Sequence, residues 1–129
     1  MTTPHVPILL LFSRNPQLIY LMQRYAENCS CQLLVNQDVT TVITTIGQQP
    51  PNLILLDVSQ ANADGHEALR KIKENTAPPF IPIILCGTSE MDWLNCEAEG
   101  HLLQPILFND FAHAVSEVGI PISQNTKEV

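Results

Sequence analysis

Residues 51–65 read Pro51-Pro-Asn-Leu-Ile-Leu-Leu-Asp57-Val-Ser-Gln-Ala-Asn-Ala-Asp64-Gly65. Four consecutive apolar residues precede the carboxylate of Asp57, and two prolines stand before them. A short apolar run between turn-forming residues predicts a strand buried on both faces, which is typical of a parallel sheet covered by helices. Ligands of open α/β sheets bind outside the carboxyl ends of the strands, so Asp57 is a candidate for chemistry. Gly65 is expected to open the next helix.

Strand and helix patterns alternate on both sides of this segment. Pro16 suits a first helical turn, Asp38 a helix cap, and Ser89 the cap of a later helix. Strands are predicted over 7–12, 31–35, 53–57, 81–86 and 100–103, and helices over 16–28, 39–48, 65–74 and 90–99, with a last helix capped by Asn109 or Asp110 and ending near residue 118. This alternation predicts an α/β fold, a doubly wound five-stranded parallel sheet of order 2-1-3-4-5, as in flavodoxin-like proteins.

Length and composition indicate one globular domain. The 129 residues are 45% apolar, and we expect a single domain over 1–129, with its core over 7–118 and a flexible tail over 119–129. The chain lacks an apolar segment of membrane-spanning length and the pattern of a signal peptide. The prediction is therefore a cytoplasmic protein.

Charge restricts the partners. The net charge is −7, and the longest basic segment is the short Arg70-Lys-Ile-Lys73. An acidic chain is poorly suited to bind nucleic acid, because that affinity comes mainly from contacts of Lys and Arg with phosphates. It is equally poorly suited to bind an anionic membrane surface. Other proteins or small ligands remain as partners.

The cysteines and histidines do not predict a metal site. Cys29-Ser-Cys31 has no second pair of Cys or His at ligand spacing, and we interpret the cysteines as small apolar residues. No Gly-rich phosphate loop or paired catalytic carboxylates occur either.

The predicted strand order brings the carboxyl ends of four strands around a common crevice. The residues expected to face it are Ser13, Arg14, Asp57, Gly87, Thr88 and Gln104.

At this point the sequence resembles the receiver domains of bacterial two-component response regulators, over roughly residues 7–118. Asp57 ends the third strand, and Asp64-Gly65 follows at the family's spacing. Matches to the first, fourth and fifth strands are Ile8-Leu-Leu-Leu-Phe-Ser-Arg-Asn-Pro16, Pro82-Ile-Ile-Leu, and Gly100-His-Leu-Leu-Gln-Pro105-Ile.

The resemblance implies phosphoryl transfer from a histidine kinase to Asp57, with a magnesium ion held by that aspartate and an acidic pair. In this chain the acidic pair falls on Ser13 and Arg14. The family's lysine falls on Gln104, and its Thr or Ser switch falls on Gly87, with Thr88 and Ser89 adjacent. Its aromatic switch falls on His101, and its Met-Pro pair falls on Gln60-Ala61. The resemblance therefore implies a degenerate pocket without a metal or other cofactor.

Two roles for Arg14 are open. Its guanidinium could replace the missing cation and hold phosphate, or it could form a salt bridge with Asp57 that closes the pocket. We favour the salt bridge, because positioning and charge neutralisation supply most of phosphoryl-transfer catalysis.

The leading hypothesis is a non-enzymatic, receiver-like domain that works by protein contact with a histidine kinase or another signalling protein. The resemblance places the contact face, and a homodimer interface, on the helix over 90–99, the fifth strand and the last helix. Trp93 and His101 are candidate interface residues there. The alternatives are a functional phospho-acceptor at Asp57 and a flavodoxin-like module that binds a small ligand in the crevice.

Overall fold

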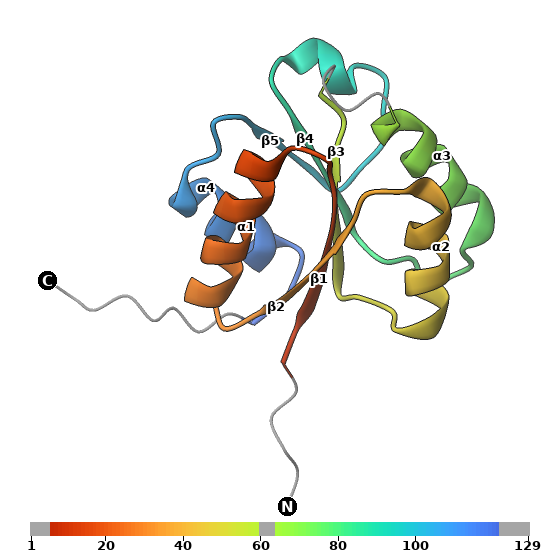
Figure 1. Ribbon diagram of the computed structural model, residues 1–129, viewed down its shortest axis with the longest axis horizontal. Coiled ribbons are helices and arrows are strands. Elements are labelled where there is room, and N and C mark those ends of the chain that lie inside the picture. Colours follow the sequence, from red (N-terminus) through yellow and green to blue (C-terminus); the bar gives the residue numbers. More distant parts are fainter. Residues whose placement is uncertain (1–5, 60–63, 122–129) are drawn as a thin grey trace, which may run out of the picture.

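The computed structural model describes residues 6–59 and 64–121 and forms a parallel sheet with helices on both faces (Figure 1). The strand order is β2-β1-β3-β4-β5, as predicted. The strands are β1 (Ile8–Phe12), β2 (Gln32–Asn36), β3 (Leu53–Asp57), β4 (Ile83–Gly87) and β5 (Gly100–Leu103), and the helices are α1 (Pro16–Asn28), α2 (Val39–Gln48), α3 (Gly65–Asn75), the 3-10 helix η1 (Glu90–Trp93) and α4 (Phe108–Glu117).

The three central strands, β1, β3 and β4, are buried along their whole length, which explains their unbroken apolar sequences. Alternate residues of a strand point to opposite faces, so each strand contributes to two cores. Leu9 and Leu11 pack in the core covered by α1 and α4. Leu10 and Phe12 pack in the core covered by α2 and α3 (Figure 1).

Local capping fixes where the first two helices begin. The side chain of Asn15 accepts a hydrogen bond from the backbone N–H of Gln17, and Asp38 accepts one from Thr41. The last helix begins earlier than predicted, at Phe108, and neither Asn109 nor Asp110 caps it. The apolar residues of its first turn start the helix through packing rather than through a polar cap.

The predicted helix over 90–99 is wrong. Ser89 caps a helical turn as expected, but only the 3-10 helix η1 follows, and Asn95 adopts the left-handed region with φ of 67°. A non-glycine residue in that region interrupts an α-helix. Trp93, Cys96 and Ala98 nevertheless pack against the core of α2 and α3, so burial as well as the 3-10 hydrogen bonds holds the segment.

The cysteines behave as apolar residues. Cys29, Cys31 and Cys86 are buried, and all four thiols are free. Burial, together with the neighbouring Cys29, raises the pKa of Cys31 to about 11, and burial with the charge of Asp57 raises the pKa of Cys86. These thiols therefore carry little of the nucleophilic thiolate at neutral pH.

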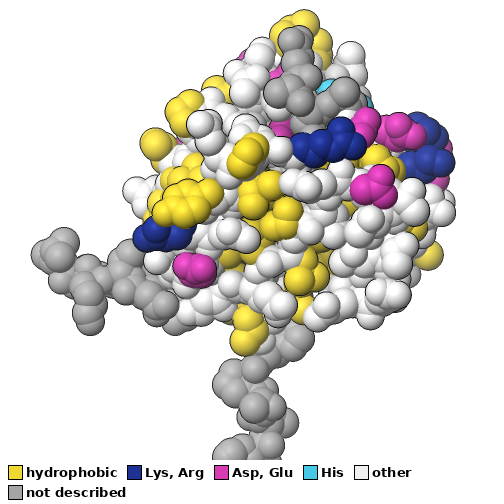
Figure 2. Space-filling model, in the orientation of Figure 1, with side chains coloured by type: hydrophobic (Ala, Val, Ile, Leu, Met, Phe, Trp, Pro, Cys, Tyr) yellow, Lys and Arg dark blue, Asp and Glu magenta, His cyan; other side chains and the backbone are white. Residues whose placement is uncertain are grey.

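The packed chain continues beyond the predicted end of the core at residue 118, because Ile120 is buried against α1 and α4. The rest of the predicted tail, residues 122–129, lies outside the described residues. Within the described ranges, no helix has the length and apolar character needed to cross a bilayer. On the face seen in Figure 2, Lys and Arg side chains are scattered and form no basic patch.

Candidate functional site

Asp57 lies at the carboxyl end of β3, and its side chain is fully buried. Its Oδ2 accepts a hydrogen bond of 2.6 Å from the hydroxyl of Ser13. Its Oδ1 accepts the hydroxyl of Ser59 at 2.7 Å and the backbone N–H of Ser59 at 3.1 Å. Donors from this chain therefore engage both oxygens of the carboxylate, which offsets the cost of burying it.

Ser13 connects this carboxylate to the turn between β1 and α1. It is buried, its backbone N–H donates to the carbonyl of Asn36, and its hydroxyl oxygen accepts the N–H of Asn15 at 3.1 Å. The Ser13 hydroxyl is thus oriented by one accepted and one donated bond. A small neutral side chain therefore faces Asp57.

Ser59 was missed by the sequence reasoning, although a local signal exists. An aspartate followed two residues later by serine can accept the backbone N–H of that residue in an Asx turn, and Asp57 does so here. The Ser59 hydroxyl adds a second bond to the same oxygen. The loop after β3 therefore starts by folding back onto Asp57.

The predicted salt bridge between Arg14 and Asp57 is wrong. The Arg14 side chain is half exposed, with its Nη2 2.5 Å from Oδ2 of Asp64 and its Nε donating to the carbonyl of Gln37. Burying a guanidinium beside Asp57 would cost several kcal/mol of desolvation, whereas Arg14 at the rim stays hydrated. As a surface pair it contributes about 0–1 kcal/mol to stability.

Asp92 organises the end of β4 and was not predicted as a site residue. Its buried Oδ2 accepts the N–H of Thr88 at 2.8 Å, the N–H of Ser89 at 3.2 Å and the hydroxyl of Thr88 at 3.3 Å. A Cβ added to Gly87 would lie 2.9 Å from Cβ of Asp92 and 3.0 Å from the Trp93 ring. A hydroxyl-bearing residue therefore does not fit at Gly87, and the Thr88 hydroxyl is directed to Asp92.

We expect Asp92→Ala to lower the free energy of unfolding by about 1–3 kcal/mol, because it removes the buried acceptor of three hydrogen bonds at the end of β4. Urea denaturation measures this change. Glu90→Ala is the matched control, since Glu90 lies exposed in the same turn, and we expect it to change stability by less than about 0.5 kcal/mol. Equal effects of the two substitutions would contradict the organising role of Asp92.

Gln104 and the candidate interface residues lie in the segments after β4: Trp93 in η1, His101 in β5, and Gln104 directly after β5. The backbone N–H of Gln104 donates to the carbonyl of Gly87 at 2.7 Å, and its side-chain Nε2 is buried without a hydrogen-bond partner. The rings of Trp93 and His101 stack with centroids 4.9 Å apart. The structure thus brings these two rings together, half-buried and exposed respectively.

The residues around Asp57 do not fit a magnesium ion. Magnesium binds carboxylate oxygens in octahedral geometry, and here hydroxyl and amide donors direct hydrogen atoms at the carboxylate instead. Nowhere in residues 6–59 and 64–121 do three His, Cys, Asp or Glu side chains gather into a metal-binding group. The Gln60-Ala61 pair lies outside the described residues.

Solved structures with the same architecture include receiver domains. The receiver domain of sensor histidine kinase PA1611 from Pseudomonas aeruginosa, solved with magnesium coordinated in its active-site cleft, aligns with a TM-score of 0.77 at 19% identity, covering 90% of this chain and all of that one. The chain has the receiver fold. The N-terminal signal receiver domain of a response regulator from Bacteroides fragilis aligns with a TM-score of 0.73 at 15% identity, covering 88% and 97%.

Sequence comparison agrees with this receiver fold, although no protein-family model matches the chain. The chain is 30% identical over 77 residues to "Probable methanogenesis regulatory protein FilR2" of Methanothrix harundinacea, covering 56% of this chain and 50% of that protein. It is 32% identical over 72 residues to transcriptional regulatory protein YxdJ of Bacillus subtilis, covering 56% and 31%. The matched regions span half or less of these curated relatives.

Proposed function

We propose that this chain is a receiver-like signalling domain that acts in the cytoplasm by protein contact, without magnesium-dependent phosphorylation and without enzymatic activity. One observation carries the proposal: the buried Asp57 carboxylate is engaged by Ser13 and Ser59 on both oxygens. The positions where the resemblance places an acidic pair are occupied by Ser13 and by Arg14, which binds Asp64 instead.

The chemistry of phosphoryl transfer supports this proposal. Transfer to a carboxylate requires a free nucleophilic oxygen in line with the leaving group, and cations that neutralise the phosphoryl oxygens. In this chain the hydroxyl of Ser13 donates a hydrogen bond to Oδ2 of Asp57. Arg14, the basic residue after β1, donates to Asp64 instead. This arrangement favours a domain that works without phosphoryl transfer.

The contact surface that we propose includes η1 and β5 but differs from the predicted one, because the helix over 90–99 is absent. Three apolar side chains of this region are at least half exposed: Met91, Leu94 and Leu103. The stacked Trp93 and His101 lie in the same region. We propose a histidine kinase, another signalling protein or a second copy of the chain as the partner.

The test is incubation with acetyl phosphate, with and without magnesium, followed by intact-mass measurement. We expect no phosphorylated species in either condition, and no change in Trp93 fluorescence when magnesium is titrated. Asp57→Asn is the control for adventitious labelling. A stable acyl phosphate that forms in the unmodified chain and is lost in Asp57→Asn would establish the alternative, a functional phospho-acceptor.

A further inference from the structure

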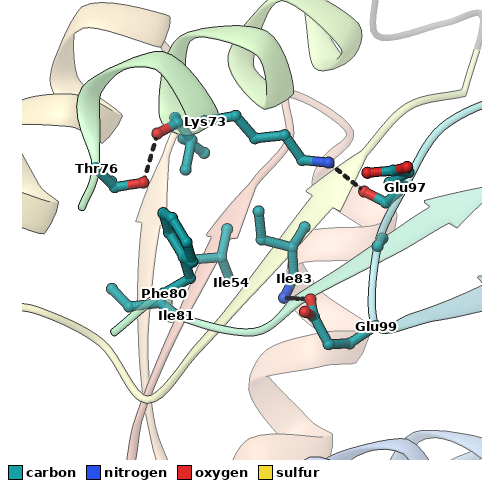
Figure 3. A pocket seen from close by; sticks show the side chains of 10 residues that line it. Ile54, Lys73, Thr76, Phe80, Ile81, Ile83, Glu97 and Glu99 are labelled. Atoms are coloured by element: carbon teal, nitrogen blue, oxygen red, sulfur yellow. Dashed lines mark hydrogen bonds between the residues drawn. The ribbon is translucent and has the colours of Figure 1, made fainter. Parts of the chain in front are cut away.

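A cavity of about 390 Å³ lies at the amino ends of β3 and β4 (Figure 3). Asp57 lies at the opposite, carboxyl end of β3. Its walls come from the last turns of α3, the loop before β4 and the segment that leads into β5. The apolar lining residues are Ile54, Ile72, Phe80, Ile81, Ile83 and Ala98.

The cavity exists because the connection between β4 and β5 contains no α-helix. In an α/β sheet, a helix on each crossover normally covers the apolar face beneath it. Here Cys96 and Ala98 pack against that face, and the small side chain of Ala98 lines the cavity together with Ile54 and Ile83. Phe80, at the rim, is 62% exposed although it is a large apolar residue.

Three polar side chains of the cavity are already bonded to backbone groups of the chain itself. Nζ of Lys73 donates to the carbonyl of Glu97 at 2.7 Å, and the hydroxyl of Thr76 donates to the carbonyl of Ile72 at 2.8 Å (Figure 3). Oε1 of Glu99 accepts the N–H of Ile83 at 2.7 Å. A site for a small molecule normally offers free polar groups that fix its orientation. This cavity offers apolar walls instead.

The charge around the cavity is predominantly acidic. The side chains of Glu97 and Glu99 lie at its mouth, and both residues are exposed. The sequence contains no Lys or Arg between Lys73 and Lys127, whereas several acidic residues occur in that interval. Lys73 is the basic residue of the lining, and it is bonded to a backbone carbonyl.

We propose that this cavity receives an amphipathic helix of a partner protein, whose apolar face fills the space left by the missing crossover helix and whose Lys or Arg residues meet Glu97 and Glu99. Apolar residues at three- and four-residue spacing would enter the groove, as in other helix-in-groove complexes. Charge complementarity would increase the association rate and the specificity. This inference adds a second contact surface to the one proposed on η1 and β5, names its partner class, and rests on the proposed contact function.

The probe is a dye-labelled helical peptide of leucine and lysine, with leucine at positions i, i+3, i+4 and i+7, measured by fluorescence anisotropy. We expect saturable binding to the unmodified chain. Ala98→Phe, which fills the cavity, and Phe80→Ser, which removes part of its rim, should each weaken binding about tenfold, the equivalent of one large anchor residue. Thermal melts establish that both variants fold.

Charge variants and control peptides complete the test. Glu97→Lys should weaken binding several-fold, whereas Glu27→Lys, on an exposed position of α1, should leave it unchanged. A peptide of the same composition in scrambled order, and one with glutamate in place of lysine, should bind weakly or not at all. Equal binding of the scrambled peptide, or equal losses in Glu27→Lys and Glu97→Lys, would overturn the proposal.

A small-molecule site is a separate outcome. If the apolar dye 1-anilinonaphthalene-8-sulfonate binds the folded chain, is lost in Ala98→Phe and is not displaced by the peptide, the helix proposal is refuted in favour of a small ligand. The assay uses no phosphate donor, so its failure is independent of the phosphorylation test. Phosphorylation at Asp57 together with peptide binding would refute the contact-only function and leave the docking site standing.

Discussion

Gly65→Ala is expected to lower the free energy of unfolding by about 3 kcal/mol or more, because overpacking against fixed backbone exceeds the usual cost of an added methyl group. A Cβ at Gly65 would overlap the backbone oxygen of Asp57 and lie 2.8 Å from Cα of Val58. Both atoms belong to the buried end of β3 and to the residue that follows it. The first turn of α3 would have to move away from the sheet. Urea denaturation with far-UV circular dichroism measures the loss.

Gly47→Ala provides the matched control for this prediction. Gly47 lies inside α2, and an added Cβ there meets no atom within 4 Å. Alanine favours the helix over glycine by about 0.5–1 kcal/mol, so this substitution should raise stability. Opposite signs for the two changes would show that the close approach of α3 to Asp57, rather than glycine flexibility, is what requires Gly65. A Gly65→Ala chain as stable as the unmodified one would exclude that close approach.

Most element positions could be predicted because they depend on local sequence, and the strand order followed from the alternation of strands and helices. The apolar runs at β1, β3 and β4 have few interpretations other than buried strands, and the cap residues Asn15 and Asp38 mark helix starts. The segment after Ser89 shows the limit of such signals. A capped start and nearby apolar residues are common to an α-helix and to a single 3-10 turn, and sequence pattern alone does not distinguish them.

At the candidate site, the sequence located Asp57 and Ser13 because strand ends follow from the topology. The directions of the neighbouring side chains did not follow from the topology. Arg14 lies next to Ser13 in sequence, yet its long side chain reaches outward to Asp64, because solvent stabilises a guanidinium more than a buried position does. Asp92 turns inward to accept three hydrogen bonds from Thr88 and Ser89, four and three residues before it. With Ser89 it forms a capping box, a local signal that the sequence reasoning did not use.

Asp57→Ala is expected to destabilise the fold by about 2–4 kcal/mol, because three buried donor bonds from Ser13 and Ser59 lose their acceptor. The sign of this change in stability distinguishes two kinds of pocket. In a pocket that held several carboxylates, removing one would relieve repulsion and raise stability. With hydroxyl and amide donors as its neighbours, the carboxylate is instead the acceptor that joins the ends of β1 and β3. Chemical denaturation of the single variant gives the magnitude.

A double-mutant cycle with Ser13→Ala separates this bond from general cavity effects. Once Asp57 is gone, the hydroxyl of Ser13 has lost its acceptor, so deleting it should cost less than in the unmodified chain. We expect a coupling energy of about 1–2 kcal/mol, within the range for directly contacting residues. Ser116→Ala is the control, because Ser116 is exposed on α4 and should show no coupling to Asp57. Additive effects of Ser13→Ala and Asp57→Ala would mean that the 2.6 Å bond contributes nothing to stability, and Asp57 would then not be the acceptor that joins the ends of β1 and β3.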